Sequence, residues 1–539
     1  MLRKNVFWKI LFVIPIVVLI VLRNYSYYWD GVDIAYYLNN PTHPKMFHQH
    51  HLLFAPFCYS LFYIVTKLGI VIKSLDFLIL LNIISGIIFL IIVYVSLNTL
   101  FPQSPFSGAI GVLITGVSYI FGTYLRNSDQ YIIPLTICSL IILRIIRHFR
   151  ATATLRITYV DWILLFFAIM LHQMALFMIP ALIYAEWQMM GKAGFKKVIF
   201  HVLILILGLS LSYVLIYFLA NPSQSFSSFW EWAIGYGKKE FWVFKEDYPG
   251  VPIINLSVAE SILSNKALFI APIERYSVLR LHEFKLVYGH SLVGEICGWF
   301  LYVIVLAFIL FGFYRMFSEV RTRKIAIFLL IWILPLLAFM QIFVPYACFY
   351  RMFYLFPLTI FIVACINSCI KSRRGIVAGV VILFVYMYTN FIYGFIPESI
   401  PSNNPYLMFA QYVKENSTKR DLFIMPVDDY FYSKYLRYFG DRDVLKDKYF
   451  KMNYFRETSV EEVKEITNNT REWIINRYDN IYIYRVTSVP RNGYLMMIPL
   501  FHRSDTPEYL VLNLNQIKYK EQIDFLDRTF HRMEVSINY

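Results

Sequence analysis

The sequence predicts an α-helical polytopic membrane protein, and three features support this fold class. Hydrophobic residues make up 58% of the 539 residues and charged residues only 16%. The mean hydropathy is +0.54. Apolar runs of spanning length recur along residues 1–396, and a chain that crosses lipid this way satisfies its backbone hydrogen bonds as helices. The formal net charge of +15 fits Lys and Arg on cytoplasmic loops, and without a basic soluble module nucleic acid is not an expected partner.

Apolar runs of about 17 to 25 residues are long enough to span the bilayer. The expected crossings are 6–22, 76–97, 106–125, 130–149, 198–219, 295–314, 325–345, 350–370 and 376–396, with two shorter ones inside 157–190. Residues 6–22 lack a small-residue cleavage site and are interpreted as a retained helix. The segment 52–72 contains Pro56 and Lys67. We therefore expect it to be a re-entrant or juxtamembrane helical segment.

Four basic clusters determine the expected topology. They lie at 144–156, 192–197, 315–324 and 371–374. Each is expected on the cytoplasmic side, which requires about eleven crossings. The loops 23–75 and 220–294 then lie outside, as does the region after the last crossing. We expect a bacterial inner membrane protein whose functional groups face the periplasm or exterior.

Residues 397–539 differ from the rest because charged residues become frequent after a proline-containing linker. Helices are predicted at 405–417, 428–439 and 458–477, and strands at 422–426, 481–486 and 508–514. Alternating short helices and strands predict a small extracytoplasmic α/β domain. The region has no phosphate loop and no nucleophile elbow.

Two carboxylates follow the first apolar run, Asp30 and Asp33, within the aromatic stretch Trp29–Tyr37. A carboxylate at a membrane rim is costly unless it lines a cavity or meets a partner. We therefore take both as candidates for chemistry. Asp129 lies at another outer turn, where it is either a third candidate or a helix cap.

Other polar groups are predicted on the same outer face. His48, His50 and His51 have metal-ligand residue types, although adjacent ring nitrogens diverge on a helix, so a divalent metal ion stays open. His172 is either a ligand or an interhelical hydrogen-bond donor. Arg351 either binds substrate or reaches the headgroups.

Four short motifs, in this order and on this face, resemble the GT-C glycosyltransferases, most closely the aminoarabinose and protein mannosyltransferase-like enzymes. They are the acidic stretch Trp29–Tyr37, the stretch Leu52–Pro56, the turn from Arg126 to Asp129, and Tyr350–Pro357. The resemblance covers about residues 1–400 in order and predicted topology.

The resemblance implies an inverting transfer of a sugar from a polyprenyl-phosphate-linked donor to a lipid, glycan or protein acceptor. In this family the acid of the first loop deprotonates or orients the acceptor, which matches Asp33, with Asp30 as the alternative because Ile34 stands where a second acid often follows. The second-loop acid matches Asp129, and Arg351 matches the arginine that neutralises the lipid phosphate. The other side chains expected to bind substrate or phosphate are Arg126, His48, His50, His51, His172, Tyr37 and Tyr350.

Three other classes remain open from the sequence. A flippase for lipid-linked saccharides would place ionisable groups near the midplane, often in two repeated halves. A ligase or polymerase would use the same donors with a large outer loop, for which 220–294 is a candidate. A non-catalytic scaffold would use its external domain to bind a partner.

Overall fold

The computed structural model consists of two compact units, Met1–Arg280 with Gly289–Ser399, and Leu281–Tyr288 with Ile400–Tyr539. The division after Ser399 lies close to the predicted boundary after residue 396. The structure describes residues 13–42, 46–150, 159–191, 195–221, 225–234, 262–263, 292–342, 348–369, 372–419, 421–426, 430–441, 443–451, 480–485, 494–499, 509–513, 517–525 and 528–535.

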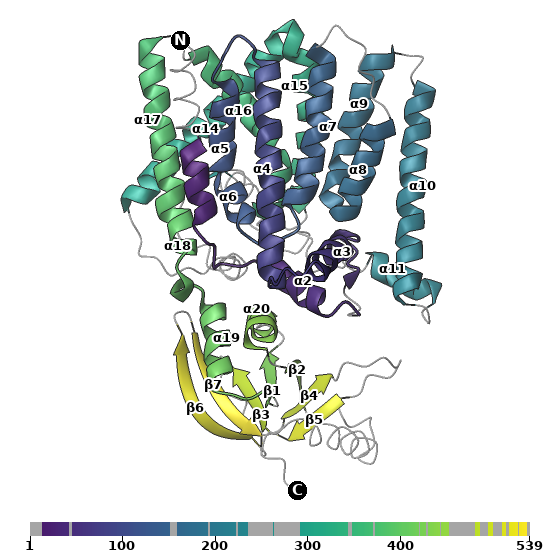
Figure 1. The fold of residues 1–539 in the computed structure, drawn as a ribbon, viewed down its shortest axis with the longest axis vertical. Helices are drawn as coiled ribbons and strands as arrows, with labels where there is room; N and C mark the ends of the chain where they lie inside the picture. The colour runs from purple at the N-terminus through teal and green to yellow at the C-terminus, as the bar shows by residue number, and fades with distance from the viewer. Residues whose placement is uncertain are drawn as a thin grey trace. The chain divides into compact units, whose positions relative to one another are not determined.

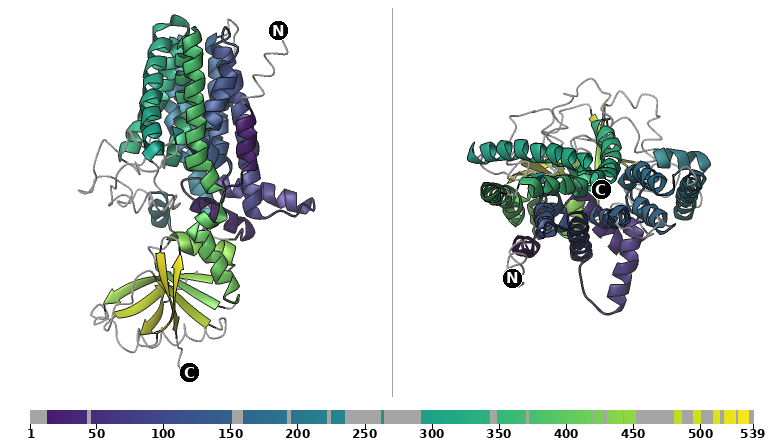
Figure 2. Two further views of the ribbon diagram at one scale, coloured as in Figure 1. Left: turned by 90° about the vertical axis from the view of Figure 1, so that its left-hand side faces the viewer. Right: turned by 90° about the horizontal axis from the view of Figure 1, so that it is seen from above.

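The first unit is a bundle of helices that run side by side (Figures 1 and 2). Within it, α4 packs against α7, and α14 packs against α15 and α16. The helices are α4 (Ser74–Leu100), α5 (Ser107–Gly116), α6 (Tyr119–Leu125), α7 (Ile132–Arg150), α8 (Tyr159–Leu171), α9 (Ile179–Met190), α10 (Phe195–Ala220), α14 (Leu292–Ser318), α15 (Val320–Ile342), α16 (Leu355–Cys369) and α17 (Arg373–Asn390).

Fewer helices qualify as full spans than the sequence predicted. In the part of the chain that the structure describes, 7 helices are long and apolar enough to cross a membrane, or up to 8 if the bent pair α5 and α6 is one span. The expected eleven crossings are therefore not supported. The shortfall arises because α8 and α9 have 13 and 12 residues, below the roughly 20 that a straight span needs, and because residues 6–12 of the first run lie outside the described residues.

The helices α8 and α9 form an antiparallel pair. Trp162, near the start of α8, donates from Nε1 to Glu186, near the end of α9, at 3.0 Å. His172 lies at the turn between them, before a 3₁₀ helix at Gln173–Met178. The predicted split of 157–190 at His172 is therefore present, but as two short helices.

The helices α5 and α6 are bent by 70°. The break occurs at Ser118, whose ψ of 140° is extended. A broken helix in a membrane needs partners for its freed backbone groups. Asn390 of α17 supplies one, because its Nδ2 donates to the Val117 carbonyl at 2.8 Å.

Three short helices lie across one end of the bundle: α2 (Trp29–Asn39), α3 (Phe54–Lys67) and α11 (Phe226–Ile234) (Figure 1). With 14 residues, α3 is about 21 Å long, shorter than the roughly 30 Å hydrocarbon core. Its Tyr63 and Ile64 are exposed. The helix α3 is therefore too short to cross that core, and the re-entrant or juxtamembrane position of 52–72 stays a prediction.

The second unit contains a seven-stranded sheet in the order β5-β4-β2-β1-β3-β7-β6. Its central strand β1 pairs in parallel with β2 and β3, and the outer pairings are antiparallel. The strands are β1 (Asp421–Pro426), β2 (Asp443–Lys451), β3 (Asn480–Arg485), β4 (Tyr494–Pro499), β5 (Tyr509–Asn513), β6 (Ile517–Phe525) and β7 (Arg528–Val535). The helices are α19 (Pro405–Glu415) and α20 (Tyr430–Tyr435).

The three strands predicted from the sequence coincide with β1, β3 and β5 to within a residue at each end. The other four were missed because charged residues interrupt most of them, as in β6 and β7. The predicted helix at 458–477 lies outside the described residues.

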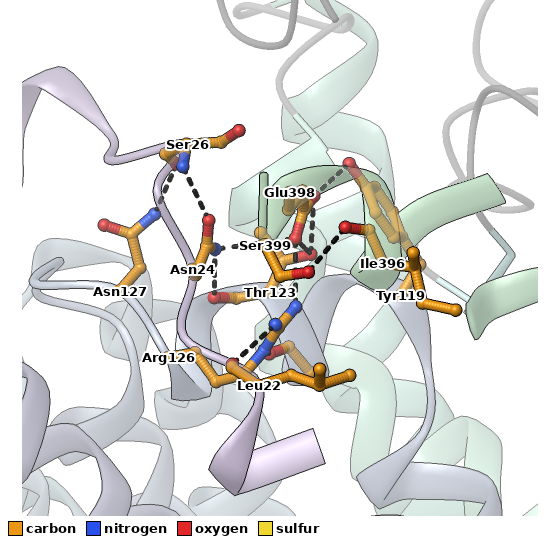
Figure 3. Close-up of polar contacts among 11 residues, drawn as sticks. Leu22, Asn24, Ser26, Tyr119, Thr123, Arg126, Asn127, Ile396, Glu398 and Ser399 are labelled. Atoms are coloured by element: carbon orange, nitrogen blue, oxygen red, sulfur yellow. Dashed lines mark hydrogen bonds and ion pairs between the residues drawn. The ribbon is translucent and has the colours of Figure 1, made fainter. Parts of the chain in front are cut away.

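A buried ion pair joins three distant segments of the first unit (Figure 3). Glu398 ends α18 (Ile396–Glu398), which follows α17 after a π-helical turn at Phe391–Phe395. The Glu398 carboxylate accepts hydrogen bonds from Tyr119 Oη at 2.9 Å and Thr123 Oγ1 at 3.1 Å. Arg126 Nη2 lies 3.1 Å from Glu398 Oε2, and both side chains are buried.

The same network fixes the chain between the first helix and α2. Arg126 Nη1 donates to the Leu22 carbonyl at 3.0 Å, and the Tyr25 amide donates to the Glu398 carbonyl at 2.8 Å. Asn127 continues it, because its Nδ2 donates to the Ser26 carbonyl at 3.0 Å. The start of α2 is therefore tied to the α6 end and to α18.

We expect Glu398→Gln to lower the free energy of unfolding by about 3–5 kcal/mol, because it leaves a buried guanidinium without its carboxylate. The measurement is denaturant unfolding of the purified protein in detergent, followed by circular dichroism. Asp76→Asn is the matched control, since Asp76 pairs with Arg23 at the surface, with side chains 36% and 52% exposed. That change should cost at most about 1 kcal/mol. Equal losses in the two variants would contradict the structural role of the buried pair.

Candidate functional site

The helix α2 carries both candidate carboxylates on one face. Asp30 and Asp33 are three residues apart, a spacing that makes side chains neighbours on a helix. Gly31 lets α2 approach the segment before α7 closely. A Cβ on Gly31 would lie 2.2 Å from Ser128 Oγ and 2.8 Å from the Ser128 carbonyl carbon. Only glycine fits this contact, which brings the start of α2 to residues 127–129.

The segment that α2 contacts is held rigidly from α4. Asn82 Nδ2 donates to the carbonyls of Asn127 and Asp129, each at 2.7 Å. The Asp129 side chain is 1% exposed, and its Oδ1 accepts the Gln130 amide at 2.7 Å. A buried carboxylate is thus positioned beside α2, on backbone that cannot shift without breaking the Asn82 contacts.

The Tyr131 phenol lies within the electrostatic range of acidic groups from separate parts of the chain. The ring is buried, and burial raises the pKa of Tyr131 well above its usual range; the nearby charge of Asp129, then Tyr350, then Asp30, raises it further. Groups from three separate parts of the chain therefore act on one phenol. Of the two acids on α2, it is Asp30 that appears among these neighbours.

An aromatic cluster surrounds this point. The Tyr131 ring lies 4.8 Å from His172 and 5.3 Å from Phe349, and Phe349 lies 4.4 Å from Tyr350. We define the aromatic cluster as Tyr28, Tyr124, Tyr131, His172, Phe349, Tyr350 and Phe353, whose neighbouring rings are in contact. Flat apolar rings beside carboxylates suit a sugar, whose faces are apolar and whose hydroxyl groups need acceptors.

Arg351 follows the cluster residue Tyr350 in a 3₁₀ helix, Cys348–Tyr354, that leads into α16. It is 0% exposed, and its Nη1 donates to Tyr354 Oη at 3.0 Å. A side chain this deeply buried does not reach headgroups at the surface. It instead places a buried guanidinium directly after the cluster residue Tyr350 in the chain.

Two of the candidate histidines, His50 and His172, are neutral at neutral pH. The His50 carbonyl accepts the Gln173 amide at 2.9 Å, which ties this turn to the α8–α9 turn. Burial lowers the pKa of His50 to about 4. Burial, and then the charges of His51 and His50, hold the pKa of His172 well below its usual range. At neutral pH they therefore carry no charge with which to neutralise a phosphate.

The geometry of the histidines does not fit a metal ion. The rings of His48 and His51 stack 4.4 Å apart with an interplanar angle of 10°. A metal ion binds in the plane of each imidazole, so two parallel stacked rings cannot aim at the same ion. Across the described residues, no group of three or more His, Cys, Asp or Glu side chains is arranged to hold one.

The structure brings together some of the predicted residues and separates others. The rings of Tyr350 and His172 contact Tyr131, Asp129 lies two residues before it, and the charge of Asp30 acts on its phenol. Arg351 follows Tyr350 in the chain. Arg126, expected to bind phosphate, is instead engaged by Glu398. Tyr37 lies near the end of α2, where its ring contacts Tyr36.

Several positioning residues were not predicted from the sequence, namely Gly31, Asn82, Tyr131 and Glu398. Of these, only Gly31 could have been noticed in the sequence, because it is a glycine directly after the candidate acid Asp30. The others are ordinary residue types in apolar or linker sequence, so their roles depend on contacts made far along the chain.

Solved structures similar to this chain include ArnT from Cupriavidus metallidurans. The form bound to undecaprenyl phosphate has a TM-score of 0.51 at 10% identity and covers 91% of this chain and 98% of that chain. The apo state has a TM-score of 0.52 at 11% identity and covers 89% and 93%. An apo oligosaccharyltransferase from Archaeoglobus fulgidus is more distant, with a TM-score of 0.47, 12% identity, and 89% and 69% covered.

Neither a family model nor a curated protein matches the chain by sequence. The likeness is therefore one of fold, and it rests on the two ArnT structures. The chain has the fold of the two ArnT structures, which agrees with the GT-C-like fold expected from the four sequence motifs.

We expect Gly31→Ala to disrupt the site, because its Cβ would collide with the Ser128 backbone and push α2 away from Asp129. Gly379→Ala is the control, since a Cβ there meets no atom within 4 Å and alanine is favoured in a helix. The measurement is the thermal unfolding temperature in detergent together with crosslinking between cysteines introduced at positions 30 and 129. Unchanged crosslinking in Gly31→Ala would contradict the close approach.

The lowered pKa of His50 predicts a pH dependence. The unfolded chain binds a proton near the ordinary value of about 6.5, whereas the folded chain does so only near 4. Stability is therefore complete above about 6.5 and declines as the pH falls towards 4. We expect His50→Gln to reduce the drop in unfolding temperature between neutral pH and about pH 5. An identical drop in the variant would assign the acid sensitivity elsewhere.

Proposed function

We propose that this chain is an inverting glycosyltransferase that moves a sugar from a polyprenyl-phosphate-linked donor to a hydroxyl-bearing acceptor. The observation that carries the proposal is the convergence of Asp30, Asp129 and Tyr350 on Tyr131, with Arg351 next in the chain. The GT-C-like fold supports it, and the ArnT of similar fold was solved with undecaprenyl phosphate.

In this proposal a carboxylate of α2 removes the proton from the acceptor hydroxyl. The acceptor oxygen forms its bond to the anomeric carbon as the bond from that carbon to the donor phosphate oxygen breaks. A positioned carboxylate serves as general base for such a step. Asp30 is the better candidate, because it acts on the same phenol as Asp129, and Asp33 one turn later is the alternative.

The departing lipid phosphate takes the bonding electrons and needs positive charge near it. Arg351 is proposed for this role, because it is buried and permanently charged, whereas His50 and His172 are neutral. The aromatic cluster would hold the sugar between these charges. The proposal defines the donor only as a sugar linked to a polyprenyl phosphate and the acceptor only as a molecule with a hydroxyl group.

We further propose that this site faces the outer side of the membrane. The support is charge: Arg150 ends α7 and Arg315 lies in the last turn of α14, both at the end of the bundle opposite α2. Positive charges of this kind mark the cytoplasmic side.

We expect Asp30→Asn to reduce sugar transfer about 10²–10⁴-fold, because the acceptor loses its base. The assay incubates the purified protein with undecaprenyl-phosphate-linked sugars and a membrane extract as the source of the hydroxyl-bearing acceptor, and it measures released undecaprenyl phosphate. Asp76→Asn, a surface carboxylate at the same end of the bundle, should leave the rate unchanged. Arg351→Gln should weaken binding of undecaprenyl phosphate itself.

The comparison with Asp33→Asn decides between the two acids. If Asp33→Asn is inactive and Asp30→Asn retains full activity, the base is Asp33. If both variants turn over normally while the wild type is active, neither carboxylate is the base and the proposed mechanism is wrong.

A further inference from the structure

A polar cavity lies at the end of the helix bundle opposite α2. The helix α4 connects the two ends, because Ser74 at its start donates to the Ala35 carbonyl of α2 at 2.8 Å, whereas Leu100 at its end lines this cavity. With 27 residues, α4 is about 40 Å long. Figure 1 shows α2 and α3 at one end of α4 only.

The cavity has a volume of about 240 Å³. A single water molecule needs only about 10–15 Å³ of such space, so a small polar headgroup fits. Its wall includes the α4–α5 turn, the ends of α7, α14 and α16, and the start of α15.

Positive charge dominates this cavity. Arg150, Arg315 and Arg321 line it from three different helices, against a single carboxylate, Glu319. Within the described part of the chain, the side chains of Arg315 and Arg321 have no carboxylate partner at ion-pair distance. Two positive charges thus stay uncompensated around one concave space.

Capping of helix ends does not account for Arg315 and Arg321. The end of α14 is capped by other residues: Arg323 Nε donates to the Phe317 carbonyl, and Thr322 Oγ1 donates to the Met316 carbonyl, each at 2.8 Å. Arg150 does cap α4, through the Thr99 and Leu100 carbonyls. Arg315 and Arg321 are left for another partner.

The wall of the cavity is held in place by side-chain hydrogen bonds. Asn367 of α16 donates from Nδ2 to Ser107 Oγ at 2.9 Å, which joins the end of α16 to the start of α5. Arg150 is fixed by the α4 carbonyls. A guanidinium that is already held in place loses little further conformational entropy when an anion binds.

We propose that this cavity is a binding site for a phosphate monoester, independent of the proposed transfer reaction. A phosphate monoester carries about 1.5 to 2 negative charges at neutral pH, which matches the uncompensated charge. Arginine forms short paired hydrogen bonds with phosphate oxygens. Because the cavity lies where the apolar helices α4 and α14 end, the ester is either a lipid headgroup at that surface or a soluble phosphate ester.

The test uses the full-length protein in detergent and native mass spectrometry. The probes are phosphatidic acid, phosphatidylcholine and soluble glycerol 3-phosphate. We expect phosphatidic acid to bind more tightly than phosphatidylcholine, and Arg315→Gln with Arg321→Gln to weaken that binding about tenfold or more, since each lost charge-assisted hydrogen bond is worth about that factor. Competition by glycerol 3-phosphate identifies a soluble ester, and its failure to compete identifies a lipid headgroup.

The matched control removes the same charge nearby. Arg373 and Arg374 begin α17, are exposed and do not line the cavity, so Arg373→Gln with Arg374→Gln should bind phosphatidic acid as the wild type does. Equal weakening in both double variants would show only general attraction to an anionic lipid and would overturn the site. Unchanged binding in the Arg315 and Arg321 variant would also overturn it. Unfolding curves without lipid identify any variant that has lost its fold. Arg315→Gln alone then replaces the double variant and should also weaken phosphatidic acid binding, whereas unchanged binding would overturn the site.

Discussion

The ion pair between Arg126 and Glu398 is the constraint on which the proposed site depends. Both groups are almost fully buried, so each charge has left water at a cost that the pairing only partly offsets. The main contribution of the ion pair is therefore to fix the positions of the segments that it joins. The pair and its hydrogen bonds hold the chain after Leu22 against the ends of α6 and α18. Without this anchor, the six residues between Leu22 and α2 would have no fixed path, and the acids of α2 no fixed position.

From that anchor, short-range packing completes the arrangement. The start of α2 rests on Ser128 through Gly31, and Asn82 holds residues 127–129 from the opposite side. The aromatic cluster then closes around Tyr131 with residues from the α8–α9 turn and from the 3₁₀ helix before α16. Asp129 and His172 thus lie beside one phenol, and Arg351 follows the cluster residue Tyr350 in the chain. In the proposed mechanism the carboxylate and the guanidinium are separate groups with separate roles.

Composition alone was sufficient to predict a polytopic membrane fold, because long apolar runs have few alternatives in water. Four polar residues at predicted helix ends also indicated the candidate site, namely Asp30, Asp129, Tyr350 and Arg351. The pairing of Arg126 with Glu398 was not predicted, because Glu398 lies 272 residues away and no local sequence pattern reveals such a contact. Across the described residues the expected eleven crossings are not supported, because hydropathy does not show that α8 and α9 end after three to four turns. Asn82 and Tyr131 could not be found, since nothing in their sequence surroundings distinguishes them.

Because α6 follows a bend, a small rotation at Ser118 displaces the far end of α6, where Arg126 lies. Its seven residues make it about 10 Å long, so a change of about 10° at Ser118 would move Arg126 by about 2 Å. Such a movement would reach both Glu398 and the backbone beneath α2. A ligand, lipid or substitution that changes the angle between α5 and α6, within the core of the bundle, would therefore shift the carboxylates without contacting them.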